Sequence, residues 1–362
     1  MEIRAMNRKS LSDFVNSPEF DRLDQLPISR HRALSQINNP RCSDSDIILI
    51  MATQDMNLMG YLGILPDYIY LHDEKIKAGW LSCFWVNESC RSQPVSGALL
   101  LHAMDSWERK ILITNFVPSL AELYRRSGMF RPLVFKTGLR AYMRSNMATI
   151  LPPKNKWFKR LRPAFTFADF LINSAASPRF LFFRGYHHDE VIVRDEEVLG
   201  ESTARFISGQ NSSSLTRRGR DELQWINEYP WIITQHKPDR NSNRYYFSSI
   251  SPRFFYKMIS FTDHSGNTSG FAMICVRDSQ MTVPYVFSVS GYHYIVRVLI
   301  NLMLEYHLSM ITIFHEGLVA SFKNFSIPFL FKKRINKPFL FSKKMEIKEL
   351  NFNDGDGDCA FY

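Results

Sequence analysis

The sequence predicts a folded protein of the mixed α/β (α+β) class with two domains. The chain has 362 residues, of which 45% are hydrophobic and 14% aromatic, and disordered chains do not carry such a load of apolar side chains. Single hydrophobic cores usually stop growing at about 250–300 residues, so this length favours two domains. Short apolar runs typical of strands alternate along the chain with segments of helical spacing.

The first domain is expected to span residues 1–145. Ile47–Thr53 is a short apolar run that indicates a buried strand, and Gly60–Leu71 with Lys77–Val86 indicates a long β-hairpin. Further predicted elements are a helix at Ser96–Trp107, a strand at Lys110–Val117, a helix at Pro118–Ser127 and a strand at Phe130–Lys136. Gly128 stands where a helix commonly ends in the left-handed conformation.

The second half of the chain repeats this order of elements without a residue-level repeat. We expect a linker with a helix over 146–190, a second and diverged domain over 191–346, and a flexible acidic tail over 347–362. The second domain would carry hairpin strands, a helix at Tyr294–His307, a strand, another helix and a terminal strand at Phe339–Ser342. A diverged second copy of the first domain explains this order.

Charge and cysteine content narrow the class of protein only in part. The formal net charge of +10 suits nucleic acid, an anionic membrane surface or a phosphorylated ligand, and does not choose among them. Five cysteines without a CxxC pair argue against a disulfide scaffold and against a structural zinc site. The most apolar stretch, Val296–Phe314, is interrupted by Arg297 and Glu305, so we expect no membrane span and a cytoplasmic protein.

A candidate phosphate-binding loop lies between the predicted hairpin and the helix that follows it. The small residues Ser96, Gly97 and Ala98 begin that helix, and Arg91 and Gln93 precede it. Backbone N–H groups at a helix N-terminus point outward and attract anions, and small residues let a phosphate approach the backbone. The stretch is therefore suited to hold a phosphate or pyrophosphate group.

This arrangement resembles the GNAT superfamily of acyl-CoA N-acyltransferases. The family's loop pattern, Gln/Arg-x-x-Gly-x-Gly/Ala, reads here Gln93-Pro-Val-Ser-Gly-Ala98, with Ser96 in place of the first glycine. Downstream, Asn115, Tyr124, Gly128 and Phe130 match the strand and helix that follow the loop in the family. The resemblance covers about Glu2–Lys136. It implies a GNAT-like twisted mixed sheet flanked by helices, in two tandem GNAT-like domains.

The resemblance also implies a function, the direct transfer of an acetyl or other acyl group from coenzyme A to an amine acceptor. Acetyl-CoA, a co-substrate, would lie between the fourth and fifth strands. Its binding residues would be Trp85, Val86, Arg91, Gln93, Val95, Ser96, Gly97, Ala98, Asn115 and Tyr124. Tyr124 would be the acid that protonates the leaving thiolate. The base stays open between Asp67, His102 and a chain of water molecules.

Other readings of the sequence remain open. Pro94 removes a backbone N–H from the loop, which favours a catalytically inactive GNAT fold used for binding. A tandem GNAT aminoacyl-transferase that uses charged tRNA is a third hypothesis, although nucleic acid is not the partner we favour. We expect no metal site. His187–Glu190 has adjacent side chains that point apart on a strand, and Asn353–Asp358 lacks the glycine and glutamate of a calcium loop.

Overall fold

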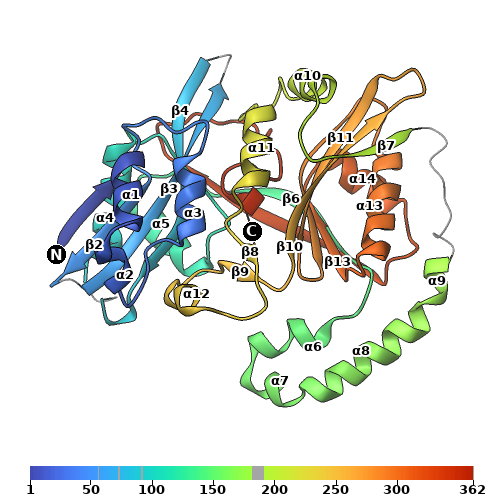
Figure 1. Ribbon diagram of the computed structural model, residues 1–362, viewed down its shortest axis with the longest axis horizontal. Coiled ribbons are helices and arrows are strands. Elements are labelled where there is room, and N and C mark those ends of the chain that lie inside the picture. The colour runs from blue at the N-terminus through green and yellow to red at the C-terminus, as the bar shows by residue number, and fades with distance from the viewer. Residues whose placement is uncertain (56, 72–73, 91–92, 182–190, 362) are drawn as a thin grey trace. The chain divides into compact units, whose positions relative to one another are not determined.

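The computed structural model describes residues 1–55, 57–71, 74–90, 93–181 and 191–361, and it divides into two compact units (Figure 1). Unit 1 comprises Met1–Lys136, Val198–Tyr256 and Lys337–Tyr362. Unit 2 comprises Thr137–Glu197 and Lys257–Asn336. Each unit therefore takes segments from both halves of the sequence.

Unit 1 is built on a mixed sheet with the strand order β1-β2-β3-β4-β5-β14. The strands are β1 (Glu2–Met6), β2 (Leu49–Gln54), β3 (Asn57–Leu71), β4 (Glu74–Val86), β5 (Ile111–Thr114) and β14 (Phe331–Phe341). Neighbouring strands from β1 to β4 are antiparallel, β5 is parallel to β4, and β14 is antiparallel to β5. The predicted hairpin is thus confirmed as β3 and β4.

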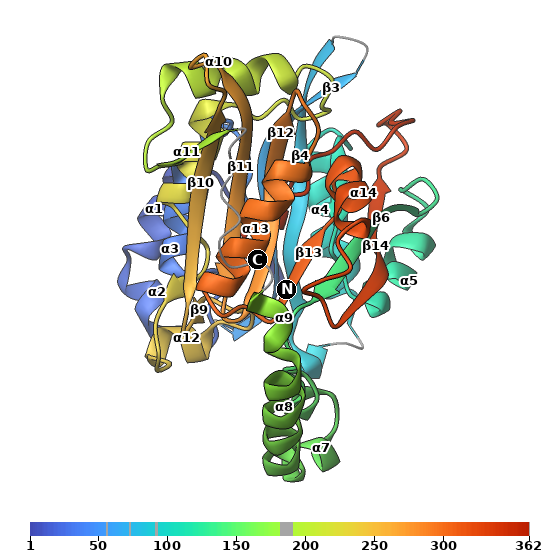
Figure 2. The same cartoon turned by 90° about the vertical axis from the view of Figure 1, so that its right-hand side faces the viewer.

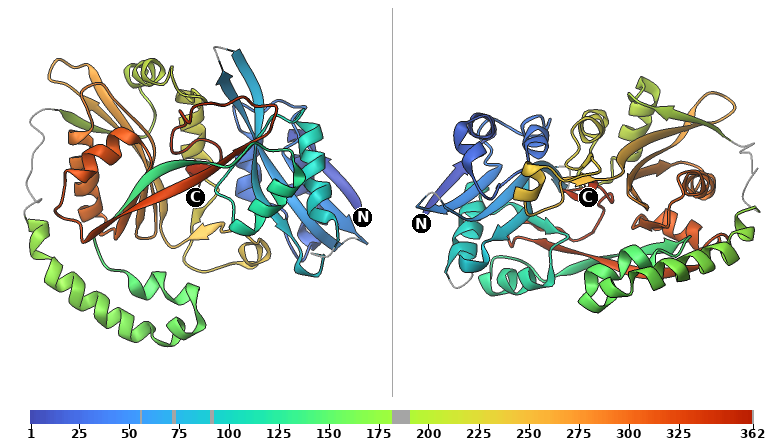
Figure 3. Two further views of the ribbon diagram at one scale, coloured as in Figure 1. Left: turned by 180° about the vertical axis from the view of Figure 1, so that it is seen from behind. Right: turned by 60° about the horizontal axis from the view of Figure 1, so that its bottom comes forward.

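Helices cover both faces of this sheet, as the amphipathic patterns require. On one face α4 (Val95–Ser106) and α5 (Pro118–Ser127) pack on β2–β5 around a core that includes Leu99, Tyr124 and Phe130 (Figure 3, left, teal). On the other face α1 (Arg8–Val15), α2 (Pro18–Arg22) and α3 (Arg30–Ile37) close a second core (Figure 1). The remaining elements are η1 (Glu88–Cys90), α10 (Glu201–Gln210), α11 (Arg220–Glu228), β8 (Ile233–Thr234), α12 (Arg240–Arg244), β9 (Ile250–Ser251) and η3 (Cys359–Phe361).

The strands of unit 2 follow one another in the order β6-β13-β12-β11-β10-β7. The strands are β6 (Val134–Tyr142), β7 (Ile192–Glu196), β10 (Phe254–Thr262), β11 (Thr268–Arg277), β12 (Gln280–Ser288) and β13 (Met310–Ile313). The helices α13 (His293–Glu305) and α14 (Glu316–Lys323) complete the unit, and α13 covers one face of its strands (Figure 2). An antiparallel hairpin, a helix, a strand parallel to the hairpin and another helix follow one another here as in unit 1.

The units differ from the sequential domains 1–145 and 191–346 that the sequence suggested. The last strand of the chain, β14, pairs with β5, with Phe339 opposite Thr114, so Lys337–Tyr362 belongs to unit 1. In turn β6, predicted as part of the first domain, pairs with β13 of unit 2, with Tyr142 opposite Met310. An exchanged strand cannot be recognised from hydrophobic pattern, because pattern indicates a strand but not its neighbour.

The predicted acidic tail is also corrected. Asp356 and Asp358 are only 1% and 2% exposed, and Phe361 stacks on Trp231 with ring centroids 4.4 Å apart. The hydroxyl of Tyr256 donates a hydrogen bond of 2.7 Å to the Ala360 carbonyl. The end of the chain is therefore an ordered, buried part of unit 1.

Candidate active site

The central feature of unit 1 is a gap that opens where β4 and β5 stop pairing. Their parallel register runs from Gly79 opposite Ile111 to Leu81 opposite Ile113. Beyond this point β4 continues to Val86, whereas β5 ends at Thr114. The two strands therefore do not pair beyond Leu81 and Ile113.

Local backbone geometry explains why the strands separate. Cys83 and Phe84 together lie opposite Leu62 of β3, which forms a β-bulge in β4. Cys83 has a φ of 52°, and Asn115, directly after β5, has a φ of 51°. Bulges bend a strand and increase its twist, and a left-handed residue turns the chain out of a strand. Both strands therefore turn at the level of the gap.

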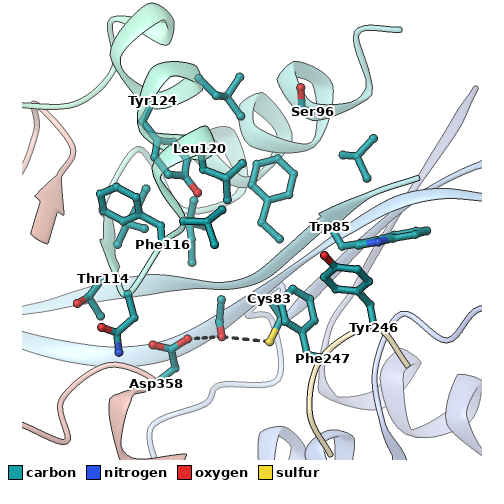
Figure 4. A pocket seen from close by; sticks show the side chains of 18 of the residues that line it. Cys83, Trp85, Ser96, Thr114, Phe116, Leu120, Tyr124, Tyr246, Phe247 and Asp358 are labelled. Carbon is teal, nitrogen blue, oxygen red and sulfur yellow. Dashed lines mark hydrogen bonds between the residues drawn. The ribbon is translucent and has the colours of Figure 1, made fainter. Parts of the chain in front are cut away.

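A cavity of about 630 Å³ occupies this gap. It is lined by the end of β4, the end of β5 with the residues after it, the starts of α4 and α5, and two more distant segments (Figure 4). The lining residues are Leu81–Val86, Gln93, Ser96, Ile113–Val117, Leu120, Leu123, Tyr124, Tyr246, Phe247 and Asp358. All of them belong to unit 1.

The structure brings together most of the residues proposed to bind coenzyme A. Trp85, Val86, Gln93, Ser96, Asn115 and Tyr124 all line the cavity. Val95 is instead fully buried in the core under α4 and anchors the start of that helix. Gly97 is exposed and Ala98 half-buried in the first turn, and Arg91 lies outside the described residues.

The N-terminus of α4 is open toward solvent at one end of the cavity. Pro94 takes the N-cap position, where its missing N–H removes no helical hydrogen bond, and the first intrahelical bond runs from the Ala98 N–H to the Pro94 carbonyl. A Cβ added to Gly97 would meet nothing within 4 Å. An anion therefore has room to approach the positive end of the helix dipole here.

Tyr124 lies on α5 at the wall of the cavity. Its ring packs edge-on between Phe116 and Phe130, with centroids 5.5 Å and 5.4 Å away. Burial, with a smaller contribution from the charge of Asp358, raises the pKa of Tyr124 well above its usual value. The phenol therefore keeps its proton at neutral pH, as an acid must.

Asp358 faces the cavity from the C-terminal segment, a position that the sequence did not indicate. Its Oδ2 accepts a hydrogen bond of 2.5 Å from the Ser82 hydroxyl, which lies on β4 next to Cys83 (Figure 4). In the same view Asp358 and Ser96 lie at opposite sides of the cavity. The cavity thus has a carboxylate at one end and a helix N-terminus at the other.

Asp67, the sequence candidate for a base, is placed elsewhere. It lies in the middle of β3, is fully buried, and forms ion pairs of 2.7 Å with both Arg41 and Arg218. Burial alone would raise the pKa of Asp67, but the two guanidinium groups outweigh it and hold the pKa below its usual value. A doubly paired carboxylate that is ionised at neutral pH and does not line the cavity is unsuited to take a proton there. His102 is exposed on α4 and does not line the cavity either.

The ion pairs of Asp67 do hold the segment that carries Asp358. Arg218, itself 1% exposed, also donates hydrogen bonds of 3.1 Å and 3.0 Å to the carbonyls of Gly355 and Gly357. Gly357 has a φ of 68°, and a Cβ there would lie 2.9 Å from the Trp80 ring. Asp67 therefore supports the cavity indirectly. Its ion pair holds Arg218 in place, and Arg218 in turn holds the C-terminal segment.

The equivalent position in unit 2 is built differently. Gly291, with a φ of 86°, and Tyr292 precede α13, and the Tyr292 ring packs on His315 with centroids 4.7 Å apart. The same ring lies so close to Gly317 that a side chain there would collide with it. The Tyr292 ring thus lies beside the first turn of α14. The corresponding helix of unit 1, α5, has the cavity beside it instead.

Comparison with solved structures identifies the fold. A conserved protein of unknown function from Enterococcus faecalis, described as a probable N-acyltransferase, superposes with a TM-score of 0.51 over 94% of this chain and 72% of that chain, at 7% identity. The chain shares the fold of this probable N-acyltransferase. A tandem GNAT protein of the clavulanic acid biosynthesis pathway (TM-score 0.49, 9% identity, 94% of this chain and 98% of that chain) is also similar. Saccharomyces cerevisiae N-myristoyltransferase with bound myristoyl-CoA is similar as well, with a TM-score of 0.49 over 94% of this chain and 78% of that chain at 10% identity.

No family model and no curated protein matches the sequence. The assignment of the fold therefore rests on structure. The mixed strand arrangement and the two units confirm the predicted mixed α/β class with two domains. Among the described residues, no helix is long and apolar enough to cross a membrane. The described residues also hold no cluster of three or more potential metal ligands, and His187–Glu190 lies outside them.

Proposed function

We propose that unit 1 is an acyltransferase that moves an acyl group from coenzyme A to an amine. The observation that carries this proposal is the cavity between the ends of β4 and β5, with the α4 N-terminus at one end and Asp358 at the other. Tyr124 lines the same cavity. A donor binding site and two proton-transfer groups thus share one space.

The donor would lie along β4. Past Leu81 the edge of β4 that faces β5 no longer belongs to the pairing register, so its backbone groups are placed to pair with the amides of a pantetheine arm as an added strand would. The pyrophosphate would then meet the α4 N-terminus near Gln93, Ser96 and Gly97, and Arg91 would add charge. Acetyl-CoA is the simplest donor of this class.

The chemistry is a direct displacement at the thioester carbon. The amine nitrogen attacks the carbonyl carbon, the N–C bond forms and the C–S bond breaks. Asp358 would take the proton that the amine loses, and Tyr124 would give its proton to the leaving thiolate. The raised pKa of Tyr124 supports this assignment, because the group stays protonated until the thiolate develops.

The acceptor would enter from the side of Asp358. A primary amine is a cation at neutral pH, and the carboxylate would attract it before deprotonating it. Tyr246 and Phe247 also line the cavity, and the Trp85 ring lies tilted against Tyr246 with centroids 6.1 Å apart. These rings favour an acceptor with a flat or apolar part next to its amine.

The test is a transfer assay that follows free CoA thiol released from acetyl-CoA, with amino sugars, polyamines and peptides with free N-termini as acceptors. We expect at least one amine to raise thiol release about tenfold or more over acetyl-CoA hydrolysis, with an acetylated product of the correct mass. Binding of acetyl-CoA without transfer to any amine would instead favour the inactive GNAT fold. Transfer that needs charged tRNA and ignores acetyl-CoA would contradict the proposal.

A further inference from the structure

A helical arm leaves the sheet of unit 2 after β6 and has no counterpart among the described elements of unit 1. It consists of α6 (Met147–Ile150), η2 (Pro152–Lys154), α7 (Lys156–Arg160), α8 (Arg162–Ala176) and α9 (Pro178–Leu181). Figure 2 shows α8 projecting away from the strands of unit 2. Along the whole of α8 the one buried residue is Asp169.

The inner face of α8 is committed to local hydrogen bonds. The Asp169 carboxylate accepts from the Ser145 hydroxyl at 2.5 Å and from the backbone N–H groups of Met147 and Ala148 at 2.9 Å, and so caps α6. The Asn173 side chain bonds both backbone groups of Ser145, at 2.8 Å and 3.0 Å. Asp169 and Asn173 are four residues apart, so they define one face of the helix.

The outer face of α8 is apolar and uncovered. At 100° per residue, Phe167 and Leu171 lie opposite Asp169, with Phe170 beside them. Phe167 and Phe170 are each 64% exposed and Leu171 51%. Trp157 on α7 is 68% exposed as well. Soluble helices normally turn such a stripe toward a core, so an exposed stripe of this kind marks a binding surface.

The arm also carries a strong positive charge. Between 145 and 181 it has six cations and one carboxylate, and that carboxylate is the buried Asp169. The cations are Lys154, Lys156, Lys159, Arg160, Arg162 and Arg179. Five of them lie on η2, α7 and the first residue of α8. Positive charge ahead of α8 opposes its helix dipole and lowers helix stability. Their placement is thus explained by a partner better than by the helix.

We propose that this arm docks on an anionic lipid surface, with Phe167, Phe170 and Leu171 in the interface and the basic cluster against the headgroups. Exposed aromatic and apolar residues beside Lys and Arg on a helix are the features of interfacial membrane binding. A dimer through this arm is disfavoured, because a second copy of the chain would bring its own positively charged arm against this one. A nucleic acid would meet the cations but offer no apolar phase to the phenylalanines.

The test is sedimentation of the full chain with phosphatidylcholine vesicles, with and without phosphatidylserine. We expect binding to the phosphatidylserine vesicles at least tenfold stronger than to pure phosphatidylcholine, and weaker at high salt. The triple variant Phe167→Ser, Phe170→Ser, Leu171→Ser and the triple variant Lys156→Gln, Lys159→Gln, Arg160→Gln should each lose at least tenfold. All six positions are exposed, so circular dichroism should show both variants folded.

Matched controls remove similar side chains elsewhere. Val198→Ser with Val289→Ser, which are 62% and 60% exposed, and Lys237→Gln with Lys333→Gln and Lys344→Gln, all exposed, should bind vesicles as the unaltered chain does. A wild-type chain that stays in the supernatant with phosphatidylserine vesicles overturns the proposal. A second result would also overturn it: light scattering shows a dimer of the wild-type chain, and the apolar triple variant is monomeric but still binds the vesicles.

Discussion

Asp358 accepts a hydrogen bond of 2.5 Å from Ser82, although the two residues lie 276 positions apart in the sequence. The bond joins the C-terminal segment to β4 just before the bulge at Cys83. It thereby places a carboxylate at the point where β4 leaves β5. The end of the chain is in this way part of the proposed active site.

Asp358→Asn should lower kcat for acyl transfer by about 100-fold or more, because the amide cannot take a proton from the amine. The amide can still accept from Ser82, so the cavity should keep its shape and the Kd for acetyl-CoA should change less than twofold. Steady-state kinetics and calorimetric titration measure the two effects. Glu346→Gln, which alters an exposed carboxylate of the C-terminal region, is the control and should be neutral. Equal kcat for Asp358→Asn and wild type would remove Asp358 from the mechanism.

Tyr124→Phe should lower kcat by about 100-fold while leaving stability nearly unchanged, since the ring still packs between Phe116 and Phe130. Burial raises the pKa of Tyr124, so its proton is lost only well above pH 10. The wild-type rate should therefore show no alkaline decline from this group below about pH 10. A pH profile of kcat measured from pH 6 to 10 checks this. A decline in kcat near pH 8 that Tyr124→Phe abolishes would contradict the raised pKa of Tyr124.

Arg218→Met should reduce the free energy of unfolding by about 3–5 kcal/mol, because it leaves Asp67 buried with one partner fewer. The pKa of Asp67 is lowered in the folded state, so its contribution to stability is present above its unfolded pKa near 4 and is lost as the pH falls through the folded-state value. Urea unfolding at pH 7 and at pH 3 should show a smaller difference between variant and wild type at pH 3. Arg220→Met, at an exposed pair with Glu201, serves as the control. An equal loss at both pH values would mean that the charge of Asp67 is not the cause.

Residues Asp356–Phe361 should exchange their backbone amides slowly, because the segment is buried and held by Arg218 and Trp231. Phe361→Ala should speed this exchange and lower kcat, with little effect on the amides of β3. Hydrogen–deuterium exchange with peptide mapping measures both. Exchange of the wild-type segment at the rate of a free peptide would return it to the flexible tail that its composition suggests.

Much of the fold was predictable from local pattern. The β3–β4 hairpin is marked by long β-branched and aromatic runs, and α5 by its Pro118 start and the left-handed Gly128 cap, whose φ is 66°. Ser96, Asn115 and Tyr124 were proposed as coenzyme A-binding residues from the order of motifs, and all three line the cavity. These features depend on residues that are close together in the sequence, so they can be predicted from it.

The remaining features depend on contacts between distant residues. Nothing near Asp358 in the sequence shows that it meets Ser82, and its acidic, glycine-rich surroundings are typical of a flexible tail. Asp67 follows a proline, a context typical of a turn residue. In the structure it is buried on β3, where it forms ion pairs with two arginines from other segments. Tyr246 and Phe247 belong to the second half of the sequence but line the cavity of unit 1.

The most direct test of the account is calorimetric titration of acetyl-CoA into wild type, Gly97→Glu and Gly209→Glu. Both glycines lie in helices with open space around them, so both variants should fold, but only Gly97 lies at the α4 N-terminus beside the cavity. We predict one acetyl-CoA site in wild type and in Gly209→Glu, and binding at least tenfold weaker in Gly97→Glu, whose carboxylate repels the pyrophosphate. No binding by wild type at millimolar acetyl-CoA, or equal binding by all three proteins, would contradict the account.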